Sequence, residues 1–173
     1  MSSQSSPKDL AAIPSGSRVF IDANIFVYHF TSTPLTAACT AFLKRVEVGD
    51  LTGITSVIAL AEVAHRLMIL EAIQTHGLKS NAAVRKLKEN PSLVQQLSDY
   101  RVATDMVSTF NVAVEPVTSA HLHTAQEFSA TGGLLTNDSL TAALMKSLSL
   151  TDLASNDPDF SVVPGLTVWQ PKR

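Results

Sequence analysis

The sequence predicts an α/β protein, a three-layer sandwich in which helices cover a mostly parallel central sheet. Short apolar runs typical of strands alternate with longer segments that have helical spacing. The first run, Val19 to Ile21, is apolar without interruption, as expected of a strand buried on both faces. With 173 residues and 45% hydrophobic content, the chain is long enough for one domain with a sizeable core.

The first half of the chain alternates strands and helices that are separated by turn residues. The first strand ends in the charge of Asp22. Pro34 begins a helix that Gly49 terminates, and Gly77 terminates the most apolar helix, which should be buried together with its Glu62. We therefore expect strands at 18–22 and 53–57, and helices at 24–30, 34–48 and 58–74.

The second half carries weaker patterns. Pro91 separates two helices of mixed polarity, and Gly133 ends a third. Pro164 and Gly165 form a turn before the last strand. We expect helices at 81–89, 92–110, 119–130 and 138–148, strands at 112–117, 150–154 and 166–169, and a turn at 155–159.

Composition and charge limit the domain extent, the location and the partners that we expect. Residues 1–17 are rich in Ser and lack the charged and apolar regions of a signal peptide, so we expect a disordered leader followed by one domain over 18–171. Charges interrupt the most apolar stretch, 56–73, so no membrane partner is expected. The single cysteine, Cys39, indicates a reducing, cytoplasmic location. With a net charge of −2, any contact with nucleic acid would depend on a local patch.

Four carboxylates occupy positions typical of a functional site. Asp22 ends a strand, Glu62 lies inside an apolar helix, Asp138 begins a helix and Asp157 follows a late strand. A parallel sheet brings strand-to-helix transitions to one edge, so these acids should converge. Each also has an ordinary explanation: a helix cap for Asp22, an ion pair with Arg66 for Glu62, the helix dipole for Asp138 and a turn for Asp157.

Converging carboxylates repel one another, and a hard divalent cation with oxygen ligands is the usual physical answer. Mg²⁺ or Mn²⁺ fits better than Zn²⁺, because the five histidines are scattered and the single cysteine offers no ligand set. The chemistry expected of such a site is metal-assisted hydrolysis of a phosphodiester.

Neutral and basic residues complete the candidate site. Asn24, Asn137 and Ser155 adjoin the acids and are candidates for holding carboxylates or water in place, whereas Ser56 is best explained as a helix cap. Basic candidates for contact with a phosphate backbone are Arg18, Arg66, Lys146 and the group Lys79, Arg85, Lys86 and Lys88. The alternative for that group is a solvated helix face.

Four segments resemble, in order, the motifs of PIN-domain nucleases, especially the VapC-type ribonuclease toxins of toxin-antitoxin pairs. They are 19–24, 56–63, 135–143 and 153–160, and the segment 163–171 resembles the last loop and edge strand of that family. The resemblance implies a PIN-like parallel sheet flanked by helices and a Mg²⁺ or Mn²⁺ site formed by Asp22, Glu62, Asp138 and Asp157. It also implies an RNA substrate, a homodimer and inhibition by a cognate antitoxin.

The chain departs from the family pattern in three places. Ser155 stands where the fourth motif commonly has Thr and keeps the hydroxyl. Asp159 is an alternative to Asp157 as the outer acid. The segment 76–110 is longer than expected of a minimal toxin, and we expect it to widen the substrate cleft or to serve an interface.

Other functions stay open. The family also contains RNA-processing nucleases that are not toxins, and catalytically weak members that bind RNA or a partner. A phosphatase of the haloacid dehalogenase type also begins with an acid after its first strand and uses Mg²⁺. Its aspartyl-phosphate chemistry needs a second Asp two residues later, where this chain has Asn24. The favoured prediction is a Mg²⁺- or Mn²⁺-dependent endoribonuclease that acts as a toxin.

Overall fold

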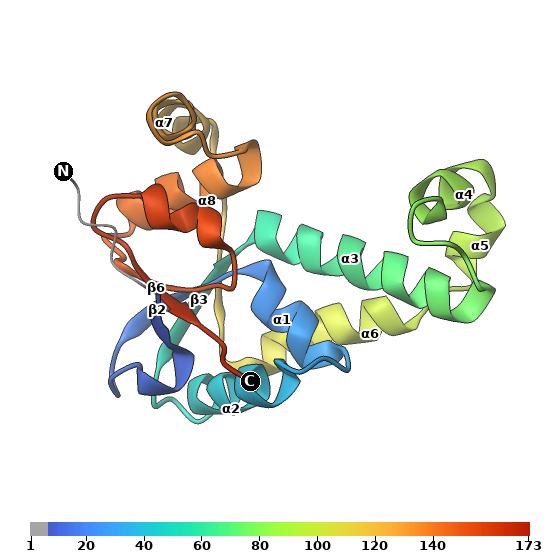
Figure 1. The fold of residues 1–173 in the computed structure, drawn as a ribbon, viewed down its shortest axis with the longest axis horizontal. Coiled ribbons are helices and arrows are strands. Elements are labelled where there is room, and N and C mark those ends of the chain that lie inside the picture. The colour runs from blue at the N-terminus through green and yellow to red at the C-terminus, as the bar shows by residue number, and fades with distance from the viewer. Residues whose placement is uncertain (1–6) are drawn as a thin grey trace.

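One parallel sheet organises the protein, seen here in a computed structural model that describes residues 7–173. Its strand order is β1-β6-β5-β2-β3-β4, and every neighbouring pair is parallel (Figure 1). The predicted parallel α/β architecture is confirmed. The strands are β1 (Lys8–Asp9), β2 (Arg18–Ile21), β3 (Thr52–Ser56), β4 (Ala113–Glu115), β5 (Asp152–Ala154) and β6 (Thr167–Gln170).

Helices connect the strands, and most of them begin within two residues of the positions predicted from the sequence. The α-helices are α1 (Ala23–Phe30), α2 (Thr36–Glu47), α3 (Val57–His76), α4 (Ala83–Glu89), α5 (Pro91–Gln95), α6 (Asp99–Met106), α7 (Ser119–Gly132) and α8 (Thr136–Ser147). Three short 3-10 helices accompany them, namely η1 (Leu10–Ala12), η2 (Val107–Phe110) and η3 (Pro158–Val162).

Strand β2 divides the core into two halves. Its Val19, Phe20 and Ile21 are fully buried, as the uninterrupted apolar run predicts. Because side chains alternate along a strand, Val19 and Ile21 pack with residues of α1, α2 and α3, whereas Phe20 packs with residues of α8. The sheet is therefore the middle layer of a three-layer sandwich.

The predicted helix over 92–110 is interrupted. In its place are α5, α6 and η2. Glu71 on α3 accepts hydrogen bonds from the backbone N–H groups of Ser98, Asp99 and Tyr100, at 2.8, 3.1 and 2.9 Å. These are the unpaired donors of a helix N-terminus, so a distant carboxylate caps α6 and fixes a new helix start that local spacing does not reveal.

The N-terminal segment corrects a prediction. Disorder was expected over 1–17, yet β1 pairs with β6, and both Leu10 and Ile13 are buried. Arg45 donates a hydrogen bond of 2.8 Å to the carbonyl of Ile13. Two buried aliphatic side chains offset the ordering cost of this short segment. The expected leader is thus wrong for residues 8–13, while residues 1–6 lie outside the described part.

Helix α3 carries a projecting arm. Its distal half extends beyond the sheet, and α4 and α5 lie at its far end (Figure 1). The arm has a small core of its own, formed by Ala72, Leu87 and Leu97 with partly buried neighbours. Among residues 7–173, no helix combines the length and apolar content that crossing a bilayer requires.

Replacing Leu10 tests the ordered N-terminal segment. Leu10→Ala should lower the free energy of unfolding by about 2–5 kcal/mol, because it removes a fully buried side chain and leaves a cavity. Urea denaturation followed by circular dichroism measures the change. The exposed neighbour Ala12 supplies the control, since Ala12→Ser should stay within about 0.5 kcal/mol of wild type. Equal stability of the two variants would contradict the described packing.

Candidate active site

Asp22 and Asp157 meet because their strands are neighbours. Strand β2 pairs with β5 so that Ile21 lies opposite Ala154, and the backbone N–H of Asp22 donates to the carbonyl of Ala154 at 3.0 Å. The residues that follow the two strands therefore emerge side by side at the carboxyl edge of the sheet, where open parallel sheets form their binding clefts.

Hydrogen bonds hold the Asp22 carboxylate in one orientation. Its Oδ1 accepts from the backbone N–H of Ala23 at 2.7 Å and caps α1. Its Oδ2 accepts from Ser155 Oγ at 2.6 Å and from Asn24 Nδ2 at 2.5 Å. The two explanations that the sequence left open, a helix cap and a site carboxylate, are compatible, because the cap orients the group.

Ser155 and Asn24 tie the two loops together. Ser155 Oγ accepts from Asn24 Nδ2 and from the backbone N–H of Asp157, both at 3.0 Å. Asn24 Oδ1 accepts from the backbone N–H of Asn156 at 3.1 Å. Both side chains are buried, so these hydrogen bonds are shielded from water. The structure thus places both neutral candidates in contact with Asp22 or with the loop that carries Asp157.

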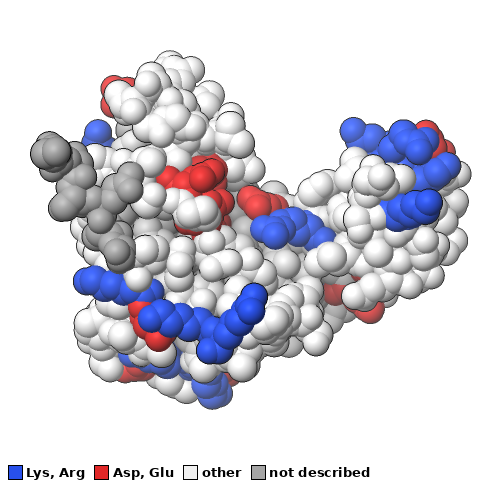
Figure 2. All heavy atoms as spheres, in the orientation of Figure 1, with Lys and Arg blue, Asp and Glu red and all other residues white. Residues whose placement is uncertain are grey.

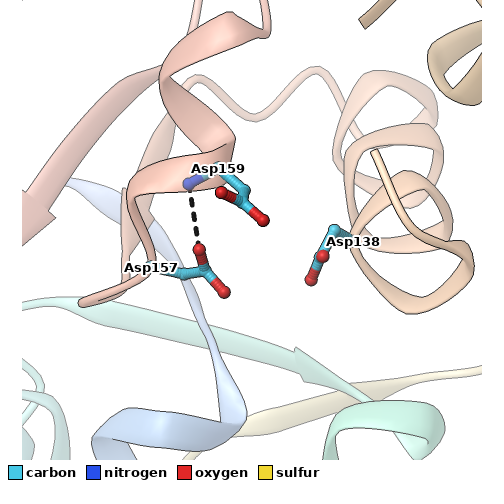
Figure 3. A group of neighbouring side chains, drawn as sticks. All are labelled: Asp138, Asp157 and Asp159. Atoms are coloured by element: carbon cyan, nitrogen blue, oxygen red, sulfur yellow. Dashed lines mark hydrogen bonds between the residues drawn. The ribbon is translucent and has the colours of Figure 1, made fainter. Parts of the chain in front are cut away.

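A second group of acids faces Asp22. Asp138 in the first turn of α8 lies opposite Asp157 and Asp159, and one carboxylate oxygen of each lies within 4.8 Å of the other two (Figure 3). Asp157 Oδ1 accepts from the backbone N–H of Asp159 at 2.9 Å, which caps η3. Asp159 therefore joins Asp157 in the group, whereas from the sequence we expected either one or the other as the outer acid.

The acids perturb one another. Burial raises the pKa of Asp138 to about 6, and the neighbouring charges of Asp157, Asp22, Asp159 and Glu62 add to the rise. Close contact is confined to Asp138, Asp157 and Asp159, while Asp22 and Glu62 lie outside that group and act on Asp138 through their charge.

The pKa of Asp22 is also raised. Burial raises its pKa to about 6 against the opposing hydrogen bonds from Ser155 and Ala23, and the charges of Glu62 and Asp157 contribute to the rise. Its hydrogen bonds therefore stabilise the ionised form without overcoming the cost of removing it from water.

Glu62 corrects the expectation of a buried charge. Its side chain is 34% exposed, and its Oε1 lies 3.5 Å from Arg66 Nη1, so the i,i+4 ion pair named as an alternative is present. The buried residues of α3 near it, Ala59, Val63 and Leu67, form one stripe, and Glu62 lies about 100° from Val63 around the helix. Its charge contributes to the raised pKa of Asp22 and Asp138, although it is not part of the close group of Asp138, Asp157 and Asp159.

Two of the predicted basic contacts lie away from the acids, and their contact with RNA stays a prediction. Arg18 begins β2, so it lies at the opposite edge of the sheet, about 13 Å along the strand from Asp22. Lys146 is eight residues after Asp138 on α8, about 12 Å along the helix. Its amine lies 5.7 Å from the centre of the Phe128 ring. Helical and strand geometry therefore separate both cations from the acids, and Arg66 is the predicted cation that stays beside them.

Asn137 differs from the other neutral candidates. Its side chain is exposed at the start of α8 and makes no hydrogen bond to any residue between 7 and 173. Adjacency to Asp138 in the sequence does not bring it to the same face, because neighbouring residues on a helix point about 100° apart.

The donor set suits a hard divalent cation. It consists of carboxylate oxygens, and within residues 7–173 no histidine or cysteine joins the group of Asp138, Asp157 and Asp159. Oxygen atoms up to 4.8 Å apart fit a shared ion whose ligand distances are about 2.0–2.6 Å. The residues present therefore fit Mg²⁺ or Mn²⁺.

Solved structures of similar fold are toxin-antitoxin proteins. One is the VapBC2 complex from Rickettsia felis, solved with a DNA fragment from the promoter of the VapBC2 proteins. It matches with a TM-score of 0.57 and 17% identity, over 90% of this chain and 99% of the other. VapC20 of Mycobacterium tuberculosis, a toxin that cleaves the sarcin-ricin loop, matches with a TM-score of 0.57 and 16% identity, over 86% and 96%. A toxin-antitoxin complex from Klebsiella pneumoniae matches with a TM-score of 0.54 and 15% identity, over 90% and 98%.

These likenesses establish a shared fold. No curated protein sequence matches the chain. The PIN domain family model, in contrast, matches residues 19–166, which include all eight α-helices and all of the acids of the candidate site. By that match the chain belongs to the PIN domain family.

Proposed function

We propose that the protein is a Mg²⁺- or Mn²⁺-dependent endoribonuclease. The observation that carries this proposal is the group of Asp138, Asp157 and Asp159 at the sheet edge, linked to Asp22 through Ser155, in a chain of the PIN domain family. Glu62, which pairs with Arg66, completes the proposed set. Carboxylates held this close, with a raised pKa at two of them, are typical of a site built for a cation and not for stability.

The residues have distinct proposed roles. Asp22, Glu62, Asp138 and Asp157 would hold the cation, with Asp159 as a further ligand. A divalent cation held there supplies Lewis-acid stabilisation of the charge that develops on a scissile phosphate and lowers the pKa of water. Ser155 and Asn24 orient Asp22, and Ser155 also positions the backbone of Asp157.

We further propose that the protein is the toxin of a toxin-antitoxin module. The support is the fold shared with VapC proteins, including a complex from Klebsiella pneumoniae. The proposal includes a cognate antitoxin that covers the acidic cleft, a homodimer and a cytoplasmic location, where RNA is accessible. An RNA-processing nuclease without toxic activity is the second candidate, because the acidic site serves either role.

Cleavage of a mixed RNA pool by the purified protein tests the nuclease directly. Cleavage should require Mg²⁺ or Mn²⁺, and Asp22→Asn should lower the rate at least about 100-fold, because it removes one of the converging charges. Glu127→Gln, which changes an exposed acid on α7, is the matched control and should keep wild-type activity. Turnover of p-nitrophenyl phosphate without RNA cleavage would favour the phosphatase, and binding of RNA without cleavage would favour a catalytically inactive member.

Asp138 should destabilise the metal-free protein. Its folded pKa is raised above the unfolded value of 3.8, so the folded state binds more protons, and stability falls as the pH rises from about 4 through 6. At pH 7.5 in EDTA, Asp138→Asn should stabilise the protein by about 1 kcal/mol, a figure reduced for its partial exposure, or about 2–4 °C in melting temperature.

Added Mn²⁺ should raise the melting temperature of wild type above that of Asp138→Asn, the reverse of the order expected in EDTA. Wild-type protein should gain melting temperature from the bound ion, whereas Asp138→Asn should gain less, because it lacks one ligand. Glu127→Gln again serves as the control. A variant that melts below wild type in EDTA, or that gains as much from Mn²⁺, would contradict the assignment of Asp138.

Ser155 should act through Asp22 and not on a substrate. Ser155→Ala removes one donor to Asp22 and the acceptor for both Asn24 and the Asp157 backbone, so it should cost about 1–3 kcal/mol of stability. It should also weaken Mn²⁺ binding about 10- to 100-fold in calorimetry. Ser155→Thr keeps the hydroxyl and should bind Mn²⁺ nearly as tightly as wild type. Equal affinity of the Ala and wild-type proteins would refute the positioning role.

A further inference from the structure

The far end of the arm is unusually basic. Four of the thirteen Lys and Arg residues fall within the ten residues 79–88, and none of the fifteen Asp and Glu residues does. Lys79, Arg85 and Lys88 are exposed, and Lys86 is half-buried. Figure 2 shows cations gathered at the far end of the arm, across a hollow from the acidic patch on the body.

Local ion pairs neutralise only part of this charge. Glu89 pairs with both Arg85, at 2.9 Å, and Lys86, at 3.4 Å, so one carboxylate serves two cations. Lys79 and Lys88 have no acidic partner within 4.0 Å anywhere in residues 7–173. The tip therefore keeps a net positive charge in a protein whose overall charge is −2.

A groove lies between the tip and Arg66. It is lined by His65, Arg66, Ile69 and Leu70 of α3 and by Val84 of α4, and it has a volume of about 320 Å³. Its first cation, Arg66, is ion-paired to Glu62. Val84 is 41% exposed and immediately precedes Arg85. The surface thus changes along α3 from acidic, through apolar, to basic, over a hollow that Figure 2 shows between the two ends.

Helix geometry gives the length of this surface. Fourteen residues separate Glu62 from His76 on α3, which is about 21 Å at 1.5 Å per residue. The 3.4 Å spacing along a stacked duplex strand sets an upper limit of roughly six nucleotides for that distance, and an unstacked strand, which is more extended, covers it with fewer.

We propose that the groove and the basic tip bind one single strand of the RNA substrate on one side of the bond that is cut. This inference rests on the proposed nuclease function and adds the surface that holds the substrate, with room for an unpaired segment of several nucleotides. The tip cations neutralise backbone phosphates, while His65, Ile69 and Val84 offer flat and apolar surface to unstacked bases. Such contacts hold the chain without reading its sequence.

Charge complementarity favours RNA as the occupant. An apolar partner would leave Lys79 and Lys88 desolvated without a counter-charge, whereas a polyanion supplies one to both. A second copy of this chain could offer its own acids, and its self-association is an outcome of the test.

The test removes the two cations that have no acidic partner. Lys79→Gln/Lys88→Gln is compared with Lys44→Gln/Lys172→Gln, a matched pair that removes the same charge from exposed lysines on α2 and near the C-terminus. Binding of mixed-sequence RNA of about 24 nucleotides is measured by fluorescence anisotropy across a range of salt concentrations, in the Asp22→Asn background that prevents cleavage. Cleavage of RNA of about 24 and about 5 nucleotides is measured in otherwise wild-type protein.

The expected results are specific to the arm. The Lys79/Lys88 variant should bind the longer RNA on the order of 10-fold more weakly near 0.1 M salt, with a salt slope shallower by about 1.4 for two lost contacts to a single strand. Its preference for long over short RNA in kcat/KM should fall by a similar factor. The Lys44/Lys172 variant should match wild type in all of these quantities.

Three results would overturn the inference, and they separate it from the nuclease proposal. If the Lys79/Lys88 and Lys44/Lys172 variants lose RNA affinity equally, the loss reflects the overall charge of the protein and not a binding site at the tip. Unchanged RNA binding combined with altered self-association in sedimentation would make the arm an interface between copies. An unchanged length preference in a protein that cleaves RNA would end this inference and leave the nuclease intact, whereas absence of cleavage in wild type would reject the nuclease itself.

Discussion

Parallel pairing of β2 with β5 is the constraint on which the rest of the site depends. The register that sets Ile21 opposite Ala154 delivers Asp22 and Ser155 to the same point, although 133 residues separate them in the chain. Ser155 and Asn24 then lock the two loops together through buried hydrogen bonds. Without that register, Asp157 and Asp159 would not face Asp138 across the sheet edge (Figure 3).

The grouped carboxylates are energetically unfavourable in a fold that is otherwise well packed. Apart from Thr55 and Ser56 of β3, the buried side chains of the strands are apolar, and no buried side-chain polar atom in residues 7–173 lacks a hydrogen-bond partner. Against that background, burial and mutual repulsion raise the pKa of Asp22 and Asp138 to about 6. Sequences that favour stability alone would place neutral residues there, so the acids are explained by a ligand that offsets their charge.

Much of this arrangement follows from local pattern. Val19 to Ile21 predicts a central strand because only a strand covered on both faces is uniformly apolar, and Asp22 then lies at the sheet edge by topology. Other features depend on contacts that spacing does not encode. Glu71 caps α6 from a distant helix, and the partners of Leu10 come from elsewhere in the fold.

Charge and sequence neighbours alone do not fix where a side chain lies. Arg18 and Lys146 are candidates by charge, but their place along a strand or helix sets them at the end of the element away from the acids. Glu62 has apolar neighbours in sequence, yet it lies beside the buried stripe of Ala59, Val63 and Leu67 on α3 and stays partly exposed. Asp159 joins the acids because Asp157 caps η3 and turns the chain back, a local geometry that turn residues alone do not specify.

The most direct test of the central claim is a crystal structure grown with Mn²⁺, with the ion located from its anomalous scattering. The account predicts a peak at the carboxyl edge of the sheet, within about 2.6 Å of oxygens from Asp138 and from at least one of Asp22 and Asp157. A well-ordered crystal in which these carboxylates bind no ion at millimolar Mn²⁺, or in which the peak lies away from them, would contradict the account.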